Sequence, residues 1–326
     1  MPVTARWHPG FESHRLKHAL FVVLVCLLAQ PASTVVAAQN TNDKSADHPL
    51  LDLARELQKA RKPDLRIAPG TPGLREAEHA LAQVQAPADA ECAGSIGAMR
   101  YASLHVDLAL ARTGQGDFTG AAQAYRSAHA CRPRDAQILS ALAGVLFDAR
   151  DYPGAREAIN AALAVEPRAV NSNRLAGNID FVEERWADAT ARFRYVAASD
   201  PDRVQAAYGQ LMFWLSQMRG GVARPEYVVR TPGDGWPQPL VLFMRGQYTE
   251  AELTVPIREG DDDDNPQANT STDERLCEAL FYVGEAYWAR GQLDVARDYF
   301  AALVNIKVIY FLEHGLALAE IAKLQR

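Results

Sequence analysis

The chain has 326 residues, of which 48% are apolar and 23% are charged, and its net charge is −6. This is an ordinary globular composition, with enough length to bury a sizeable core. The acidic balance and the lack of a basic stripe exclude the usual electrostatic footprint of a nucleic-acid-binding protein.

Residues 1–38 have the pattern of a secretory signal peptide. Basic residues precede an 11-residue apolar run, 19–29, which is short for a membrane span. Val36 and Ala38 satisfy the small-residue rule for cleavage before Gln39. We therefore expect export; the alternative is an uncleaved membrane anchor.

Residues 39–94 are expected to form a polar tether followed by two helices. The tether, 39–49, is rich in Gln, Asn, Asp and Ser. Apolar residues recur with helical spacing at 50–60 and 74–85. Prolines and glycines between them, at 62–73, predict a loop.

The segment 95–218 carries a repeat in which prolines recur every 34 residues. In each unit a small residue is followed four positions later by a large apolar residue. This pattern is typical of the tetratricopeptide repeat (TPR), an antiparallel helix pair that must stack on its neighbours to bury its apolar faces. The units are 102–135, 136–169, 170–203 and a half repeat at 204–218. Their marks are Ala121, Tyr125, Pro133, Ala155, Ile159, Pro167, Ala189, Phe193 and Pro201.

The C-terminal part begins with a degenerate repeat and loops at 219–276, where two short helices surround Gly246. The acidic run 261–264 lacks the ligand spacing of a calcium loop, so it predicts no metal site. Residues 277–326 hold the last repeat, 277–310, and a final helix, 311–324, which is expected to cap the stack. The sequence thus predicts an all-α TPR helical-hairpin solenoid with capping helices. The marks of the last repeat are Gly284, Tyr287, Gly291, Ala296 and Phe300.

Two cysteines of the first repeat are candidates for a disulfide, because export permits oxidation. Cys92 precedes the first helix of that repeat and Cys131 ends the antiparallel second helix, so the two should be neighbours. We predict a Cys92–Cys131 bridge; the alternative is two buried thiols. Cys277 would remain unpaired. Cys26 follows Val25 rather than a small residue, so we interpret it as part of the signal peptide and not as a lipid attachment site.

The first helices of stacked TPRs line a groove, which is the expected partner-binding surface. Arg174 and Asn178 lie one helical turn apart, so both could reach one peptide carboxylate. The alternative is a solvated polar face, since Tyr208 stands where a further polar partner of such a clamp is expected. Phe147, Phe181, Tyr208 and Met212 could form an apolar strip beside the pair. Packing between helices would equally explain Phe147 and Phe181.

No pattern of catalytic residues is present in the sequence. It contains no H-E-x-x-H, no C-x-x-C, no phosphate-binding glycine loop and no nucleophile elbow. We therefore expect a protein that is not an enzyme and needs no cofactor.

The C-terminal third carries a more specific likeness, in the segments 240–246, 281–284, 291–294 and 311–314, the last reading Phe-x-Glu-His. With the repeats before them, residues 95–326 resemble the NlpI family of bacterial envelope TPR lipoproteins. The resemblance implies a homodimeric adaptor without enzymatic activity, associated with the outer membrane.

The partners that the resemblance implies are a periplasmic tail-specific protease and peptidoglycan hydrolases or synthases. Glu313 and His314 match the family, with the implied role of fixing the last helix. The signal peptide departs from the family because it lacks the lipid-accepting motif, so we expect a soluble periplasmic form. The second hypothesis is a structural assembly factor for an envelope or secretion complex.

Overall fold

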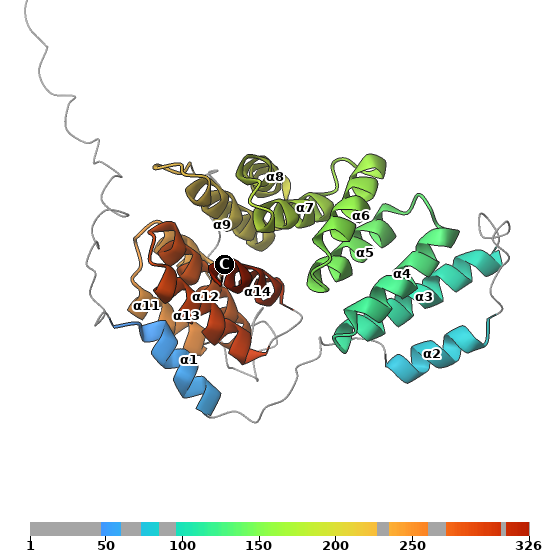
Figure 1. Ribbon diagram of the computed structural model, residues 1–326, viewed down its shortest axis with the longest axis horizontal. Helices are drawn as coiled ribbons and strands as arrows, with labels where there is room; N and C mark the ends of the chain where they lie inside the picture. The colour runs from blue at the N-terminus through green and yellow to red at the C-terminus, as the bar shows by residue number, and fades with distance from the viewer. Residues whose placement is uncertain are drawn as a thin grey trace, which may run out of the picture. The chain divides into compact units, whose positions relative to one another are not determined.

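The computed structural model describes residues 47–59, 73–84, 96–226, 235–259, 272–307 and 311–325. Every regular element within these residues is an α-helix, and the helices pack as antiparallel neighbours (Figure 1). The expected all-α fold of TPR helical hairpins is therefore confirmed. The signal peptide, the tether up to residue 46, Cys92 and the acidic run 261–264 lie outside the described residues, so the expectations about them remain predictions.

The helices follow the order of the repeats. The N-terminal helices are α1 (Pro49–Lys59) and α2 (Leu74–Ala82). The hairpins of the repeats are α3 (Ile96–Gly114) with α4 (Phe118–Cys131), α5 (Ala136–Asp148) with α6 (Tyr152–Val165), and α7 (Val170–Val182) with α8 (Trp186–Ser199). The remaining helices are α9 (Arg203–Arg219), α10 (Gln238–Met244), α11 (Glu250–Arg258), α12 (Thr272–Ala289), α13 (Leu293–Ile306) and α14 (Leu312–Leu324).

The turn inside each hairpin repeats with the same 34-residue spacing. Gly116, Arg150 and Glu184 adopt left-handed backbone conformations with φ of 76°, 63° and 61°. The next residue caps the second helix in two of the turns, where Asp117 and Asp151 accept hydrogen bonds from backbone N–H groups of the first helical turn. The turn geometry is therefore kept even where the sequence has no glycine.

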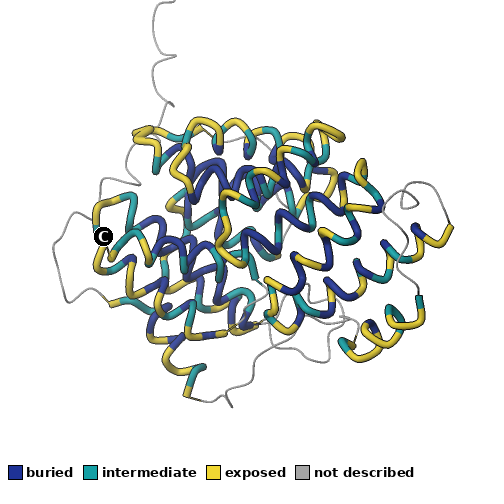
Figure 2. The backbone as a smooth tube through the Cα atoms, turned by 45° about the vertical axis from the view of Figure 1, so that its right-hand side comes forward, coloured by how far each residue is buried: buried dark blue, intermediate teal, exposed yellow. Residues whose placement is uncertain are grey.

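The two helices of a hairpin approach closely because small residues lie where they cross. Ala121, Ala155 and Ala189 are completely buried. In the third hairpin a Cβ atom added to Gly177 would lie 2.9 Å from the ring of Phe193, so a larger residue there would displace the ring. The second helices α4, α6 and α8 each end two residues before a proline. Buried residues accordingly follow the helix surfaces that face each other (Figure 2).

The last repeat, formed by α12 and α13, is packed in the same way. Ala296 and Phe300 are fully buried, and a Cβ on Gly284 would lie 2.8 Å from the Phe300 ring. Gly291 forms the left-handed turn with φ of 78°. The Tyr287 hydroxyl donates a hydrogen bond to a carboxylate on α11, which links this repeat to the preceding helix pair.

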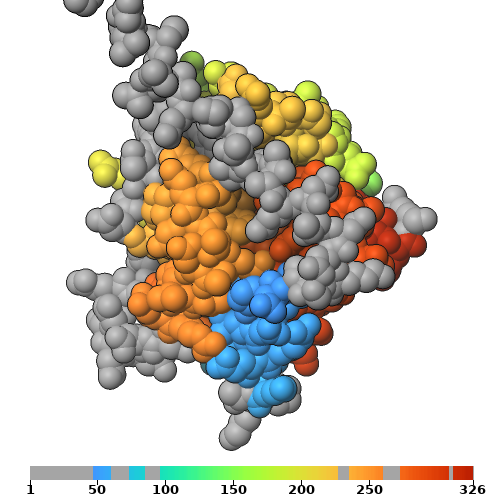
Figure 3. Space-filling model, turned by 90° about the vertical axis from the view of Figure 1, so that its left-hand side faces the viewer, coloured from blue at the N-terminus to red at the C-terminus, as the bar shows by residue number. Residues whose placement is uncertain are grey.

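Helix α1 packs against α11, α12 and α13, whereas α2 packs against α3. Figure 3 shows α1 beside the C-terminal helices. Leu50 and Leu53 are buried in this contact, and the Leu50 backbone N–H donates to Glu250 Oε1 at 3.2 Å. Arg258 of α11 holds both carboxylate oxygens of Glu56 at 2.9 and 2.7 Å. The N-terminal helix therefore belongs to the core of the last repeat, a long-range contact that local sequence patterns do not reveal.

Helix α14 follows α13, as expected for a terminal helix, but it also contacts α12 and α7. A Cβ on Gly315 would lie 3.6 Å from the Phe147 ring, so α14 reaches α5 as well. Lys323, near its end, lies 3.6 Å from Glu184 in the turn after α7. The helix thus covers part of the surface formed by the first helices of the repeats. Leu316 is fully buried, and burial of its apolar side chain stabilises the packing of α14 against the other helices.

Candidate functional site

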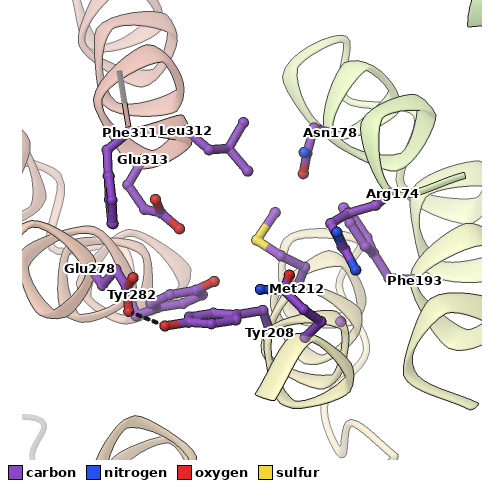
Figure 4. Close-up of a pocket in the computed structure, with 12 residues that line it drawn as sticks. Arg174, Asn178, Phe193, Tyr208, Met212, Glu278, Tyr282, Phe311, Leu312 and Glu313 are labelled. Carbon is purple, nitrogen blue, oxygen red and sulfur yellow. Dashed lines mark hydrogen bonds between the residues drawn. The ribbon is translucent and has the colours of Figure 1, made fainter. Parts of the chain in front are cut away.

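A cavity of about 320 Å³ lies where α7, α8 and α9 face α12 and α14 (Figure 4). Its apolar wall includes the rings of Tyr208, Tyr282 and Phe311 together with Met212 and Leu312. The polar side chains at its surface come from four helices: Arg174, Asn178, Gln205, Glu278 and Glu313.

The structure brings four of the six candidate groove residues together at this cavity. Arg174 and Asn178 reach it from α7, and Tyr208 and Met212 reach it from α9 (Figure 4). These four residues meet because successive first helices lie side by side in a TPR array, so residues 34 positions apart are neighbours.

The other two candidates, Phe147 and Phe181, are part of the core and do not line the cavity. They are 2% and 0% exposed, and each packs edge-on against the aromatic residue that begins the following helix. These partners are Tyr152, at a ring-centroid distance of 5.5 Å, and Trp186, at 5.2 Å. Packing between helices, the alternative interpretation, is therefore what the structure shows for these two residues.

Arg174, one of the two residues of the expected carboxylate clamp, is already engaged within the chain. Its guanidinium forms an ion pair with Asp200, a buried residue just before Pro201, and donates to Asn171 Oδ1 at 2.9 Å. A carboxylate from a partner would have to compete with Asp200 for the same charge. The sequence pattern missed Asp200 because it lies outside the first helices.

Glu278 is a functional candidate that the sequence analysis did not identify. It is 3% exposed, and its Oε2 accepts hydrogen bonds from the Tyr208 hydroxyl at 2.7 Å and from Trp236 Nε1 at 2.6 Å. Burial raises the pKa of Glu278 well above its usual range, and the nearby carboxyl of Glu313 raises it further. Its signal in the sequence is a single glutamate inside an otherwise apolar stretch, 276–284.

Glu313 lies in the first turn of α14 and is 7% exposed. Its carboxyl group points into the cavity from the side opposite to Asn178 (Figure 4). Burial raises the pKa of Glu313 to about 7. The resemblance implied only that Glu313 fixes the last helix, whereas the structure also makes it part of the cavity wall.

Asn178 presents an unpaired acceptor on the other side of the cavity. The residue is 2% exposed, and its Oδ1 is buried without a hydrogen-bond partner. A buried polar atom in this state normally costs about 1–3 kcal/mol of folding free energy. Its retention at the edge of a cavity is the kind of feature that a ligand would satisfy.

A second group of buried charges joins the same helices further along α14. Arg219 of α9 is 5% exposed on its side chain and contacts Glu285 of α12 at 2.6 Å and Glu320 of α14 at 3.1 Å. Its guanidinium carbon lies 4.1 Å from the ring centroid of Trp288. We name Arg219, Glu285 and Glu320 the Arg219 cluster; in it each carboxylate has a cationic neighbour.

The remaining predicted site concerns the cysteines. Cys131 takes part in a disulfide, and Cys277 is a buried thiol. Because Cys92 lies outside the described residues, the Cys92–Cys131 pairing itself stays a prediction.

Within the described ranges, no group of three or more histidine, cysteine, aspartate or glutamate side chains is arranged to hold a metal ion. In the same part of the chain no helix combines the length and the apolar character needed to cross a membrane.

Residues 112–175 match the Tetratricopeptide repeat family. The matched segment runs from the end of α3 through α6 into α7, so it includes one whole hairpin and the joins to its neighbours. The chain therefore contains TPRs, and repeats of this family generally serve as scaffolds that bind other proteins.

Proposed function

We propose that the protein is a non-enzymatic adaptor that binds a segment of another protein at the cavity between α7, α9, α12 and α14. The observation that carries this proposal is the buried Oδ1 of Asn178, which lacks a partner at the edge of an apolar cavity lined by first-helix residues. Concave sites of this size, mostly apolar with a few polar groups, are the usual places where proteins bind ligands.

The proposed setting is the periplasm, reached through the signal peptide, with a soluble homodimer as the working form. The proposed partners are a tail-specific protease and peptidoglycan hydrolases or synthases, which the adaptor would bring together to control cell-wall turnover. This finer proposal is supported by the resemblance of 240–246, 281–284 and 311–314 to the NlpI family. Three residues of the last segment, Phe311, Leu312 and Glu313, line the cavity, so the resemblance includes part of the candidate site.

The test is photo-crosslinking from inside the cavity in the native host. A photoreactive p-benzoylphenylalanine replaces Leu312, which lines the cavity, and in a matched strain it replaces Glu157, which is exposed on α6. We expect Leu312 to capture a protease or a wall enzyme that Glu157 does not capture, identified by mass spectrometry.

Two results would contradict the proposal. Capture of outer-membrane or secretion machinery alone would support the assembly-factor hypothesis instead. Purified protein that hydrolyses peptidoglycan or a protein substrate without help would refute the adaptor role.

A further inference from the structure

Three of the polar side chains that line the cavity, Asn178, Glu278 and Glu313, have oxygen atoms that can accept hydrogen bonds. Asn178 contributes a buried carbonyl oxygen without a partner, and Glu313 faces it with a carboxyl group (Figure 4). Glu278 adds a second carboxyl, held in place by Tyr208. A ligand that completes these contacts must bring hydrogen-bond donors.

The charge of the cavity is not balanced by its own side chains. Among the described residues that line it, Arg174 is the one cation, and its guanidinium is paired with Asp200 outside the lining. Glu278 and Glu313 therefore face the cavity without a cation committed to them. A cation that enters the cavity would favour the ionised form of both carboxyl groups and be held by them, whereas a carboxylate ligand would oppose that ionisation.

The apolar wall suits the rest of a basic side chain. Tyr208, Tyr282 and Phe311 present aromatic rings, whose faces attract cations, and Met212 and Leu312 offer surface for an aliphatic stem. A volume of about 320 Å³ leaves room for one long side chain.

We infer that the cavity recognises a basic side chain, lysine or arginine, of the bound protein, with the charged group placed between Glu313, Glu278 and Asn178. This inference rests on the proposed function, since it names the part of the partner that enters the cavity. It reverses the expectation of an Arg174–Asn178 clamp for a peptide carboxylate.

The first experiment measures binding of isolated side chains. The probes are the Nα-acetyl N-methylamides of lysine, arginine, norleucine and glutamate, titrated into protein labelled with 13C at the methionine methyl groups. Met212 reports on the cavity, and Met99, which is half exposed on α3, serves as the internal control.

We expect saturable shifts of the Met212 methyl signal with lysine and arginine, at least tenfold weaker binding of norleucine, and no shift with glutamate. The Met99 signal should not move. Equal binding of norleucine and lysine, preferential binding of glutamate, or no response of Met212 to either basic probe would overturn the inference.

The second experiment removes the charge. Glu313→Gln should lower the affinity for the lysine probe at least tenfold, while the exposed Glu157→Gln leaves it unchanged. If Glu313→Gln does not fold, Asn178→Leu replaces it, because that change removes the acceptor and leaves no unpaired polar atom. Unchanged lysine affinity in the folded variant would contradict the assignment.

The two proposals fail in different ways. Crosslinking from Leu312 that captures a partner equally well with Glu313→Gln would leave the adaptor role standing and overturn the basic side chain as its ligand. Lysine binding at Met212 combined with no captured partner would overturn the adaptor role and retain the chemistry of the cavity.

Discussion

The cavity and the Arg219 cluster lie between the same helices, α9, α12 and α14. They differ in whether their buried carboxyl groups are paired with a cation. In the Arg219 cluster one guanidinium contacts both carboxylates and lies over Trp288. In the cavity, Glu278 and Glu313 have no cation committed to them, and Asn178 keeps an unpaired oxygen.

This difference separates two roles that buried charges can have. Charges matched within the chain hold helices in a fixed arrangement, although they add little net stability compared with apolar packing. Charges left unmatched beside a cavity lower stability and are retained where a ligand completes them. The comparison predicts opposite responses when each group is removed.

The largest effect is expected from Arg219→Met, which leaves Glu285 buried without its cation and leaves Glu320 with Lys323 alone. Loss of one partner from a buried ion pair costs about 3–5 kcal/mol, and we expect a loss of this size in the free energy of unfolding. Urea denaturation followed by circular dichroism measures it. Adding Glu285→Gln and Glu320→Gln should recover most of the loss; no recovery would mean that Arg219 acts through packing alone.

The next effect is a dependence of stability on pH that comes from the cavity. Burial raises the pKa of Glu313 from 4.5 to about 7, in a setting that also contains Glu278, Tyr282, Tyr208 and Arg174. Because the folded state holds this proton more tightly than the unfolded state, its contribution is fully present below pH 4.5 and is lost as pH rises to about 7.

At about 1.4 kcal/mol per pKa unit, the Glu313 contribution is on the order of 3 kcal/mol. Urea denaturation at pH 5 and pH 8 should therefore show lower stability at the higher pH. The fall should be shallower in Glu313→Gln and unchanged in Glu157→Gln. Equal slopes for the wild type and Glu313→Gln would show that the carboxyl is solvated.

The third prediction compares the loss of stability caused by added side-chain volume at a packed helix crossing with that caused by added volume beside the cavity. Ala155 is completely buried where two helices cross, so Ala155→Leu should overpack the site and cost about 1–3 kcal/mol. Leu312→Phe adds volume next to the cavity and should change the melting temperature little. Differential scanning calorimetry of both variants tests the contrast, which fails if Leu312→Phe is the more damaging change.

The smallest effect is expected at Asn178. Replacing it by leucine removes the unpaired Oδ1 and should stabilise the protein by about 1 kcal/mol, because the desolvated acceptor no longer opposes folding. The same variant should bind partners less well. Thermal unfolding measures the expected gain in stability, and the lysine titration measures the expected loss of binding. A destabilised variant would mean that Asn178 has a structural partner.

Much of the fold could be predicted from the sequence because TPR stacking depends on residue types that recur at fixed positions of each repeat. The alanines at the helix crossings and the prolines after the second helices repeat every 34 residues, and each acts within one unit or on its neighbour. The same regularity brought Arg174, Asn178, Tyr208 and Met212 into one region, since first helices lie side by side.

The sequence by itself thus determined the helical hairpins and which helix faces are polar. Only the tertiary structure decided where α1 and α14 pack, because contacts such as Leu50 with Glu250 and Gly315 near Phe147 join segments far apart in the chain. It also decided the charge of the cavity: Asp200 neutralises Arg174, and Glu278 and Glu313 come from helices outside the first repeats. The period of the repeat shows which residues of adjacent helices meet. The electrostatics of a site depends instead on every charge that folding brings close to it.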